Sequence, residues 1–138
     1  MIGLDTNIVL RWLVDESIWP DDAPAQTALA AKTLSRRDER FFINDVVLAE
    51  TVWVLTNGMK QPRPVVITLI ERMLKAANVT LETPAAIQAA IESLGREPGD
   101  FADHLIGHIN RIHGCRTTFT FDKPASRAST FTRLGSGS

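Results

Sequence analysis

Four acidic residues stand out because each interrupts or ends an apolar segment. Asp5 interrupts the apolar start MIGLDTNIVLRWLV, and Asp122 ends the segment TTFTF. Glu50 lies within VVLAETVWVL, where a glutamate is seldom fully buried without a partner. Asp103 lies in GDFADHLIGHIN, three residues after Asp100. These carboxylates are the candidates for chemistry.

Three of the four acids, and Asp100, also have a purely structural explanation. Asp5 suits the N-cap of a helix that begins at TN. Glu50 suits a narrow polar seam with Thr51, or a pair with an arginine. Asp100 and Asp103 have the spacing of a capping box, which accounts well for Asp100 and less completely for Asp103. For each residue taken alone, the structural and the chemical explanations both remain open.

The four acids together predict a metal site. Two carboxylates roughly 5 Å apart repel each other by about 3 kcal/mol at an effective dielectric near 20, so a converging cluster needs a cation. Oxygen ligands without cysteine select hard ions, Mg²⁺ or Mn²⁺. Such an ion orients a phosphodiester and activates water for in-line attack. The chemistry expected of the cluster is that of a metal-dependent nuclease.

The elements that must position these acids follow an α/β rhythm. Short apolar segments, MIGL, FFI, VTL and TTFTF, alternate with longer helical patterns, which favours a parallel sheet. Asp5 and Asp122 would then lie at the carboxyl edge of the sheet, where ligand sites of open α/β sheets occur. The predicted helices cover residues 7–14, 45–57, 64–76, 84–94 and 100–113.

Local signals set the ends of these helices. Asp45 is a candidate N-cap, while Pro64 and Pro84 suit first-turn positions. Gly95 is a plausible C-cap, and Gly114 ends the last pattern. In that last helix one apolar stripe is expected from Phe101, Leu105, Ile109 and Ile112. The segment SIWPDDAP is expected to be a long loop.

Length and composition bound the class of protein. The chain has 138 residues, 44% of them hydrophobic, and a net charge of −1, which gives no global argument for nucleic acid. The single Cys115 and the lack of a leader or membrane-spanning pattern favour a cytoplasmic protein. We expect a single domain over residues 1–134, and a flexible tail or cloning scar, GSGS, over residues 135–138.

Four short motifs carry a resemblance to a known family. They are LDTN at 4–7, LAE at 48–50, DFADHLI at 100–106 and TFD at 120–122. In order and spacing they resemble the PIN-domain ribonucleases, specifically the VapC toxins of bacterial toxin–antitoxin pairs, over residues 1 to about 130. The resemblance implies a three-layer α/β/α fold with a central, mostly parallel sheet of four to five strands. It also implies a Mg²⁺- or Mn²⁺-dependent endoribonuclease.

The resemblance assigns roles residue by residue. Asp5, Glu50, Asp103 and Asp122 match the family's catalytic and metal-binding acids, and Asp100 matches an auxiliary acid that is common in the family. Asn7 and Thr120 match residues that orient carboxylates or water, although Asn7 could instead cap a helix and Thr120 could simply suit a strand. The implied partners are a small antitoxin protein, an RNA substrate and a second copy of the chain, with no membrane. His104 departs from the family pattern, which often has a small residue there.

Two other enzyme classes are weaker explanations. Asp100, His104 and His108 recur at i, i+4 spacing, but three ligands on one straight helix span about 12 Å, too far for one ion. Solvent-exposed histidines are the expected alternative. An aspartyl-phosphate phosphatase would need a second aspartate where the chain has Asn7.

A third alternative is a PIN-fold binding module without activity. Loss of one of the four acids would favour it, and none is missing. Trp12, Trp19 and Trp53 could stack on bases, although Trp12 and Trp53 at helical positions are more often core or dimer-interface residues. The candidates for contacts with RNA phosphates, each with a solvated surface as the alternative role, are Arg11, Arg116, Lys123 and Arg127.

Overall fold

The computed structural model describes residues 1–14 and 24–135. Contacts within the chain divide it into two compact units, Met1–Glu82 and Thr83–Ser138. The predicted loop SIWPDDAP lies, apart from Pro24, outside the described residues, and so do Trp19 and the last three residues of the GSGS tail. Each unit is described below by itself.

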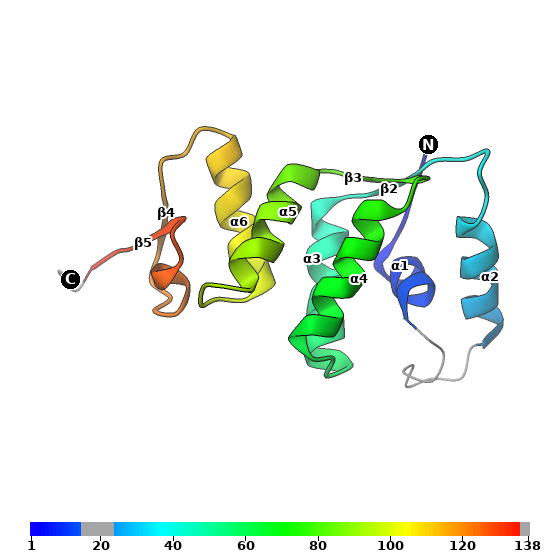
Figure 1. Cartoon of the computed structure of the whole chain (residues 1–138), viewed down its shortest axis with the longest axis horizontal. Helices are drawn as coiled ribbons and strands as arrows, with labels where there is room; N and C mark the ends of the chain where they lie inside the picture. The colour runs from blue at the N-terminus through cyan, green and yellow to red at the C-terminus, as the bar shows by residue number, and fades with distance from the viewer. Residues whose placement is uncertain (15–23, 136–138) are drawn as a thin grey trace. The chain divides into compact units, whose positions relative to one another are not determined.

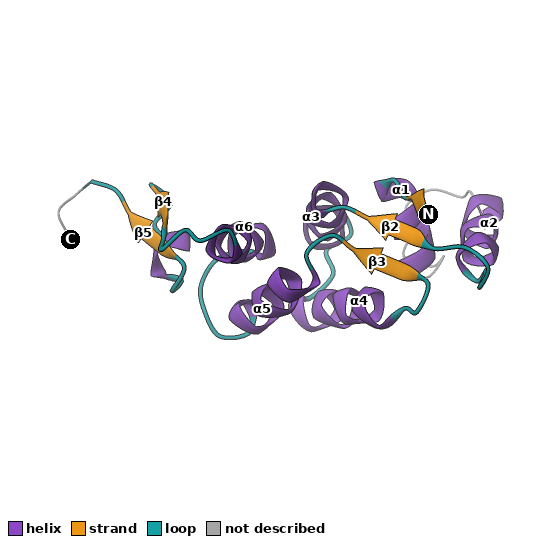
Figure 2. Ribbon diagram, turned by 90° about the horizontal axis from the view of Figure 1, so that it is seen from above, coloured by secondary structure: helices purple, strands orange, loops and turns teal. Residues whose placement is uncertain are grey.

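The first unit is built on a three-stranded parallel sheet with the order β1-β2-β3 (Figures 1 and 2). The register pairs Ile2 with Phe41 and Phe41 with Val79. Helices surround these strands, and α4 contacts β3 while α1 contacts both α2 and α3. The elements are β1 (Ile2–Gly3), α1 (Thr6–Leu13), α2 (Pro24–Leu34), β2 (Phe41–Ile43), α3 (Asp45–Trp53), the π-helix η2 (Val54–Gly58), α4 (Arg63–Lys75) and β3 (Val79–Leu81).

The core of this unit lies between the central strand and the helices. Phe41 and Ile43 of β2 are fully buried, as expected of a short apolar strand covered on both faces. Fully buried side chains also come from α1, α3, η2 and α4, among them Val9, Leu48, Leu55, Ile70 and Met73. The sheet therefore holds the ends of β1 and β2, from which α1 and α3 begin, in fixed register.

Two predicted helix features of this unit need correction. Asn44, and not Asp45, is the N-cap of α3, because its side chain accepts a 2.8 Å hydrogen bond from the Val47 amide. The predicted helix 45–57 is α-helical only to Trp53 and continues as the π-helix η2. Pro64 does lie in the first turn of α4, as predicted.

The second unit joins a helix pair to a small parallel sheet. Its elements are α5 (Pro84–Leu94), α6 (Phe101–Ile112), β4 (Thr118–Thr120), the 3₁₀ helix η3 (Ala125–Arg127) and β5 (Phe131–Arg133). β4 pairs with β5, with Thr118 opposite Phe131. Helices α5 and α6 pack together, and Gly95 caps α5 as predicted. The predicted apolar stripe of α6 is buried at Phe101 and Leu105 but ends before Ile112, which is 57% exposed.

The fold class predicted from the alternating pattern is confirmed. All five described strands pair in parallel, but they form two sheets, with three strands in the first unit and two in the second. Among the described residues the sheet of the first unit is therefore smaller than the expected central sheet of four to five strands. The strand β5 was not among the segments predicted from the sequence. Among residues 1–14 and 24–135, no helix is both long and apolar enough to cross a membrane.

Candidate active site

Asp5 lies where β1 ends and α1 begins, at the carboxyl edge of the three-stranded sheet. It is the N-cap of α1, and its Oδ1 accepts a 2.7 Å hydrogen bond from the Thr6 amide. The capping role proposed for Asp5 is therefore real. It does not exclude a ligand role, because the side chain is exposed and a carboxylate has several lone-pair sites. The cap alternative for Asn7 is wrong, since Asp5 occupies that position.

Glu50 is exposed on α3, and its partner is Thr6. The Thr6 hydroxyl donates a hydrogen bond to Glu50 Oε1, which links the start of α1 to the middle of α3. A polar seam with Thr51 is excluded, because Thr51 is fully buried and donates to the Val47 carbonyl at 2.7 Å. Glu50 is thus held by a residue of α1, the helix that Asp5 caps.

Asp5 and Glu50 line the same hollow, which has a volume of about 500 Å³. Thr6 and Asn7 contribute the other polar side chains at this end of α1. The remaining wall is mostly apolar and comes from Leu10, Trp53, Val54, Gly58 and Met59. The structure therefore brings together two of the four predicted acids, Asp5 and Glu50, and the predicted orienting residue Asn7.

The second unit groups the other acids at the start of α6. Asp100 Oδ1 accepts a 2.9 Å hydrogen bond from the Asp103 amide, and Asp103 Oδ2 accepts a 3.3 Å hydrogen bond from the Asp100 amide. This is the complete capping box that the spacing predicts. The local explanation thus covers Asp103 as well as Asp100.

Asp122 follows β4 and is oriented by two local contacts. Its amide donates to Thr120 Oγ1 at 3.0 Å, and its Oδ2 accepts from the Ala125 amide at 3.2 Å. Thr120 therefore fixes the backbone that carries Asp122, which is consistent with the orienting role predicted for it.

Electrostatics tie the three acids of this unit together. Partial burial raises the pKa of Asp103 above its ordinary value, and the neighbouring charge of Asp100 raises it further, with a smaller effect from Asp122. Burial and like charge both disfavour the ionised form, and a bound cation relieves both effects. The donor set is all oxygen, and it suits a hard divalent ion.

The two groups of acids belong to different units. Asp5 and Glu50 lie in Met1–Glu82, whereas Asp100, Asp103 and Asp122 lie in Thr83–Ser138. In the part of the chain that the structure describes, no three His, Cys, Asp or Glu side chains form a group that could hold a metal ion. Convergence of all four acids on one ion therefore stays a prediction.

The histidines differ from expectation. His104 is fully buried, not exposed, and neither of its ring nitrogens has a hydrogen-bond partner among the described residues. His108 lies 2.8 Å from the Ser93 hydroxyl, and partial burial lowers its pKa. No described feature supports a metal site formed by Asp100, His104 and His108.

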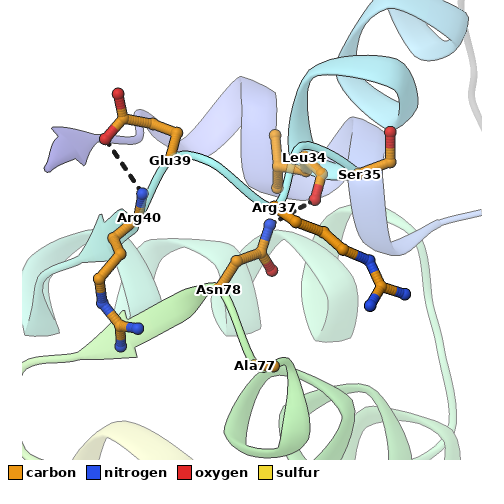
Figure 3. A pocket seen from close by; sticks show the side chains of 7 residues that line it. All are labelled: Leu34, Ser35, Arg37, Glu39, Arg40, Ala77 and Asn78. Carbon is orange, nitrogen blue, oxygen red and sulfur yellow. Dashed lines mark hydrogen bonds between the residues drawn. The ribbon is translucent and has the colours of Figure 1, made fainter.

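A second hollow lies at the opposite, amino-terminal edge of the sheet (Figure 3). It has a volume of about 550 Å³ and is lined by Leu34, Ser35, Arg37, Glu39, Arg40, Ala77 and Asn78. Within this lining, the side-chain amide of Asn78 donates a 2.7 Å hydrogen bond to the Leu34 carbonyl. None of the predicted acids lines it, so the hollow at Asp5 and Glu50 is the candidate site of this unit.

Sequence reasoning missed two residues of this site. Thr6 was part of the LDTN motif but had no assigned role, although its position after Asp5 placed it in the first turn. Trp53 was considered as a base-stacking, core or dimer-interface residue but was not placed beside the acids. It is 63% exposed and lines the hollow, which excludes the core role. Its spacing of three residues from Glu50 was the available signal, because such residues share a helical face.

Comparison with known proteins shows the family to which the chain belongs. The family model described as "PIN domain" matches residues 2–130, and the chain belongs to that family. It is similar to the VapC ribonuclease of Aquifex aeolicus (strain VF5), with 24% identity over 120 residues, which cover 87% of this chain and 86% of the relative. The resemblance drawn from the four motifs, and with it the three-layer α/β/α fold class, is confirmed.

Proposed function

We propose that this protein is a metal-dependent endoribonuclease, the toxin of a toxin–antitoxin pair. The observation that carries the proposal is the shared hollow of Asp5 and Glu50 in a chain of the PIN family. The name of the Aquifex aeolicus relative, a VapC ribonuclease, supports RNA as the substrate class.

Asp5, Glu50, Asp103 and Asp122 are the proposed catalytic acids and ligands of one or more Mg²⁺ or Mn²⁺ ions. Asp100 is the proposed auxiliary ligand. Asn7 lines the hollow and Thr120 contacts the backbone of Asp122, so both are proposed to orient carboxylates or water. Each of these side chains carries an oxygen atom that can accept a hydrogen bond or face a cation. Asn7 also carries an amide nitrogen, which donates.

When bound, a divalent cation would stabilise the charge that develops on the phosphodiester and would lower the pKa of water, so that its deprotonated form is available as the nucleophile. The chain's own residues position the carboxylates. Thr6 holds Glu50 through its hydroxyl, and the α1 cap holds Asp5. The box at the start of α6 holds Asp103 next to Asp100. These contacts fix the carboxylates before substrate arrives, which lowers the reorganisation that the reaction requires.

The partners follow from the same proposal. They are a cognate antitoxin protein, an RNA substrate and a second copy of the chain in a homodimer, in the cytoplasm. Among the arginines considered for RNA contacts, Arg11 is withdrawn, because it is 7% exposed and donates to Thr27 Oγ1 at 3.2 Å. Arg116, Lys123 and Arg127 are exposed and remain candidates for phosphate contacts.

The test is cleavage of total cellular RNA by the purified, antitoxin-free chain with Mg²⁺, with Mn²⁺ and with a chelator. We expect discrete fragments that require a metal and disappear in the Asp103→Asn variant. Circular dichroism shows that each preparation is folded. Cleavage that persists in chelator would refute metal dependence. An absence of cleavage by folded protein under every condition would favour an inactive PIN-fold binding module.

A further inference from the structure

Trp53 is placed unusually for a large apolar side chain. It ends α3, three residues after Glu50, and 63% of its surface is exposed. Three residues correspond to about 4.5 Å of rise along a helix, so the indole and the carboxylate are neighbours on one face. Trp53 and Glu50 both line the hollow that contains Asp5.

The charge of the residues that line this hollow decides how it can bind RNA. Its lining includes the two carboxylates of Asp5 and Glu50, and none of the described residues that line it is Arg or Lys. Without a cation, those carboxylates repel the phosphates of RNA. Affinity for a nucleotide at this unit must therefore come from a bound cation and from uncharged contacts.

Trp53 supplies the uncharged contact best suited to a nucleotide. An indole offers a large planar face, and stacking tolerates every base because each has a π-face. Leu10, Val54 and Met59 continue the apolar wall beside it, and the volume of about 500 Å³ is within the usual range for a small-ligand site.

We propose that Trp53 stacks on an unpaired base of the RNA next to the phosphodiester that the acids bind. This inference rests on the proposed function and adds a residue that selects single-stranded substrate. The base must be unpaired, because bases in a duplex are already stacked and their faces are covered.

The binding test uses the full wild-type chain with Ca²⁺ in place of Mg²⁺ and an end-labelled single-stranded RNA decamer of mixed sequence. Ca²⁺ takes the same kind of oxygen ligands, and a gel of the labelled RNA checks that it is not consumed. The control ligand is an abasic decamer, which keeps the phosphates but has no bases to stack. We expect the RNA decamer to quench tryptophan emission and the abasic decamer to leave it unchanged. Fluorescence anisotropy of the label gives the dissociation constants.

Substitutions at position 53 separate stacking from simple apolar contact. Trp53→Ala and Trp53→Leu are expected to weaken binding of the RNA decamer by roughly 5- to 150-fold, the range of base–aromatic stacking. Trp53→Phe should stay within a few-fold of the parent, because it keeps an aromatic face. The matched control is Val46→Ala, since Val46 is 77% exposed on the same helix and does not line the hollow.

Four outcomes would overturn the proposal. The first is tight RNA binding by Trp53→Leu, and the second is an equal effect of Trp53→Ala on the abasic decamer. The third is loss of a dimer in Trp53→Ala by light scattering with unchanged RNA binding, which would make Trp53 an interface residue. If the wild type cleaves RNA and Trp53→Ala cleaves and binds it equally well, the stacking proposal is refuted and the nuclease function is not. Base-dependent quenching without metal-dependent cleavage would instead refute the nuclease function.

Discussion

Thr6 is the residue through which the candidate site of the first unit is assembled. It is 6% exposed, its amide donates to Asp5, and its hydroxyl donates to Glu50. One buried residue therefore contacts two carboxylates that are 45 positions apart in the sequence, Asp5 through its backbone amide and Glu50 through its hydroxyl. Groups that orient metal ligands in this way commonly affect metal affinity or activity by 10- to 100-fold.

Thr6→Val should lower RNA cleavage by about 10- to 100-fold while leaving the protein folded. Valine keeps the shape of threonine and removes only the hydroxyl, and exposed Glu50 regains water, so unfolding should become easier by no more than about 1 kcal/mol. Thr6→Ser keeps the hydroxyl and is expected to retain most of the activity. A folded Thr6→Val protein that cleaves at the wild-type rate would remove the contact from the mechanism.

Asp5→Asn separates the cap of α1 from the proposed ligand. Asparagine caps a helix about as well as aspartate, and removing one charge relieves repulsion, so stability should be unchanged or slightly higher. Cleavage should fall by at least about 100-fold, because even the outer partners of a metal ligand contribute up to that much. Urea unfolding measures the predicted effect on stability, and the RNA assay measures the predicted loss of cleavage. Near-normal cleavage would leave Asp5 with only its capping role.

At the scale of elements, the position of β5 depends on a close approach to α6. A Cβ atom added to Gly107 would lie 2.1 Å from Thr130 Oγ1 and 2.7 Å from Thr130 Cβ. Gly107 is interior to α6, where alanine is normally better by about 1 kcal/mol. Here packing requires glycine, because only a residue without a side chain lets the segment that enters β5 approach the helix so closely.

Gly107→Ala should therefore destabilise the protein by up to about 2 kcal/mol, because overpacking costs about 1–3 kcal/mol and helix propensity returns about 1. Gly95→Ala is the matched control. Gly95 has a φ of −77°, and the nearest atom to an added Cβ is the Glu92 carbonyl oxygen at 3.6 Å, so alanine should be neutral or slightly stabilising there. Urea midpoints measure both variants, and equal midpoints would argue against a packed contact between α6 and Thr130.

Sequence patterns predicted the elements better than their tertiary surroundings. Period and capping signals located α4, α5 and α6 within one residue of their observed ends. Asn44 was missed as a cap because the adjacent Asp45 is an equally good candidate by type. Burial of His104 and exposure of Trp53 reverse the usual preferences of those residue types, and only contacts between elements decide them.

At the scale of the whole molecule, one family match extends over both of the compact units into which the chain divides. The PIN model matches residues 2–130, which include most of both units. The proposed four-acid site, and not the proposed single domain over 1–134, requires that Asp5 and Glu50 of the first unit share an ion with Asp103 and Asp122 of the second. A shared ion would then couple the stabilities of the units, because an ion that binds only the folded state stabilises everything that holds it.

Magnesium should therefore stabilise both units together. All three tryptophans precede residue 83, whereas Cys115, the single cysteine of the chain, lies exposed in the second unit and accepts an environment-sensitive dye. Tryptophan emission and the dye thus report urea unfolding of one unit each. At Mg²⁺ concentrations about 100 times the dissociation constant, both probes should show the same shift, about 2.7 kcal/mol.

Asp103→Asn should abolish this shift in both probes, although the substitution lies in only one unit. Glu92→Gln, which removes an exposed acid of α5 outside the proposed site, should preserve the shift. A shift confined to the dye would mean that Mg²⁺ binds the acids of the second unit alone. Coincident shifts that survive in Asp103→Asn would place the ion elsewhere. Coupled loss in both probes is expected only if a carboxylate of the second unit helps to hold an ion that also stabilises the first.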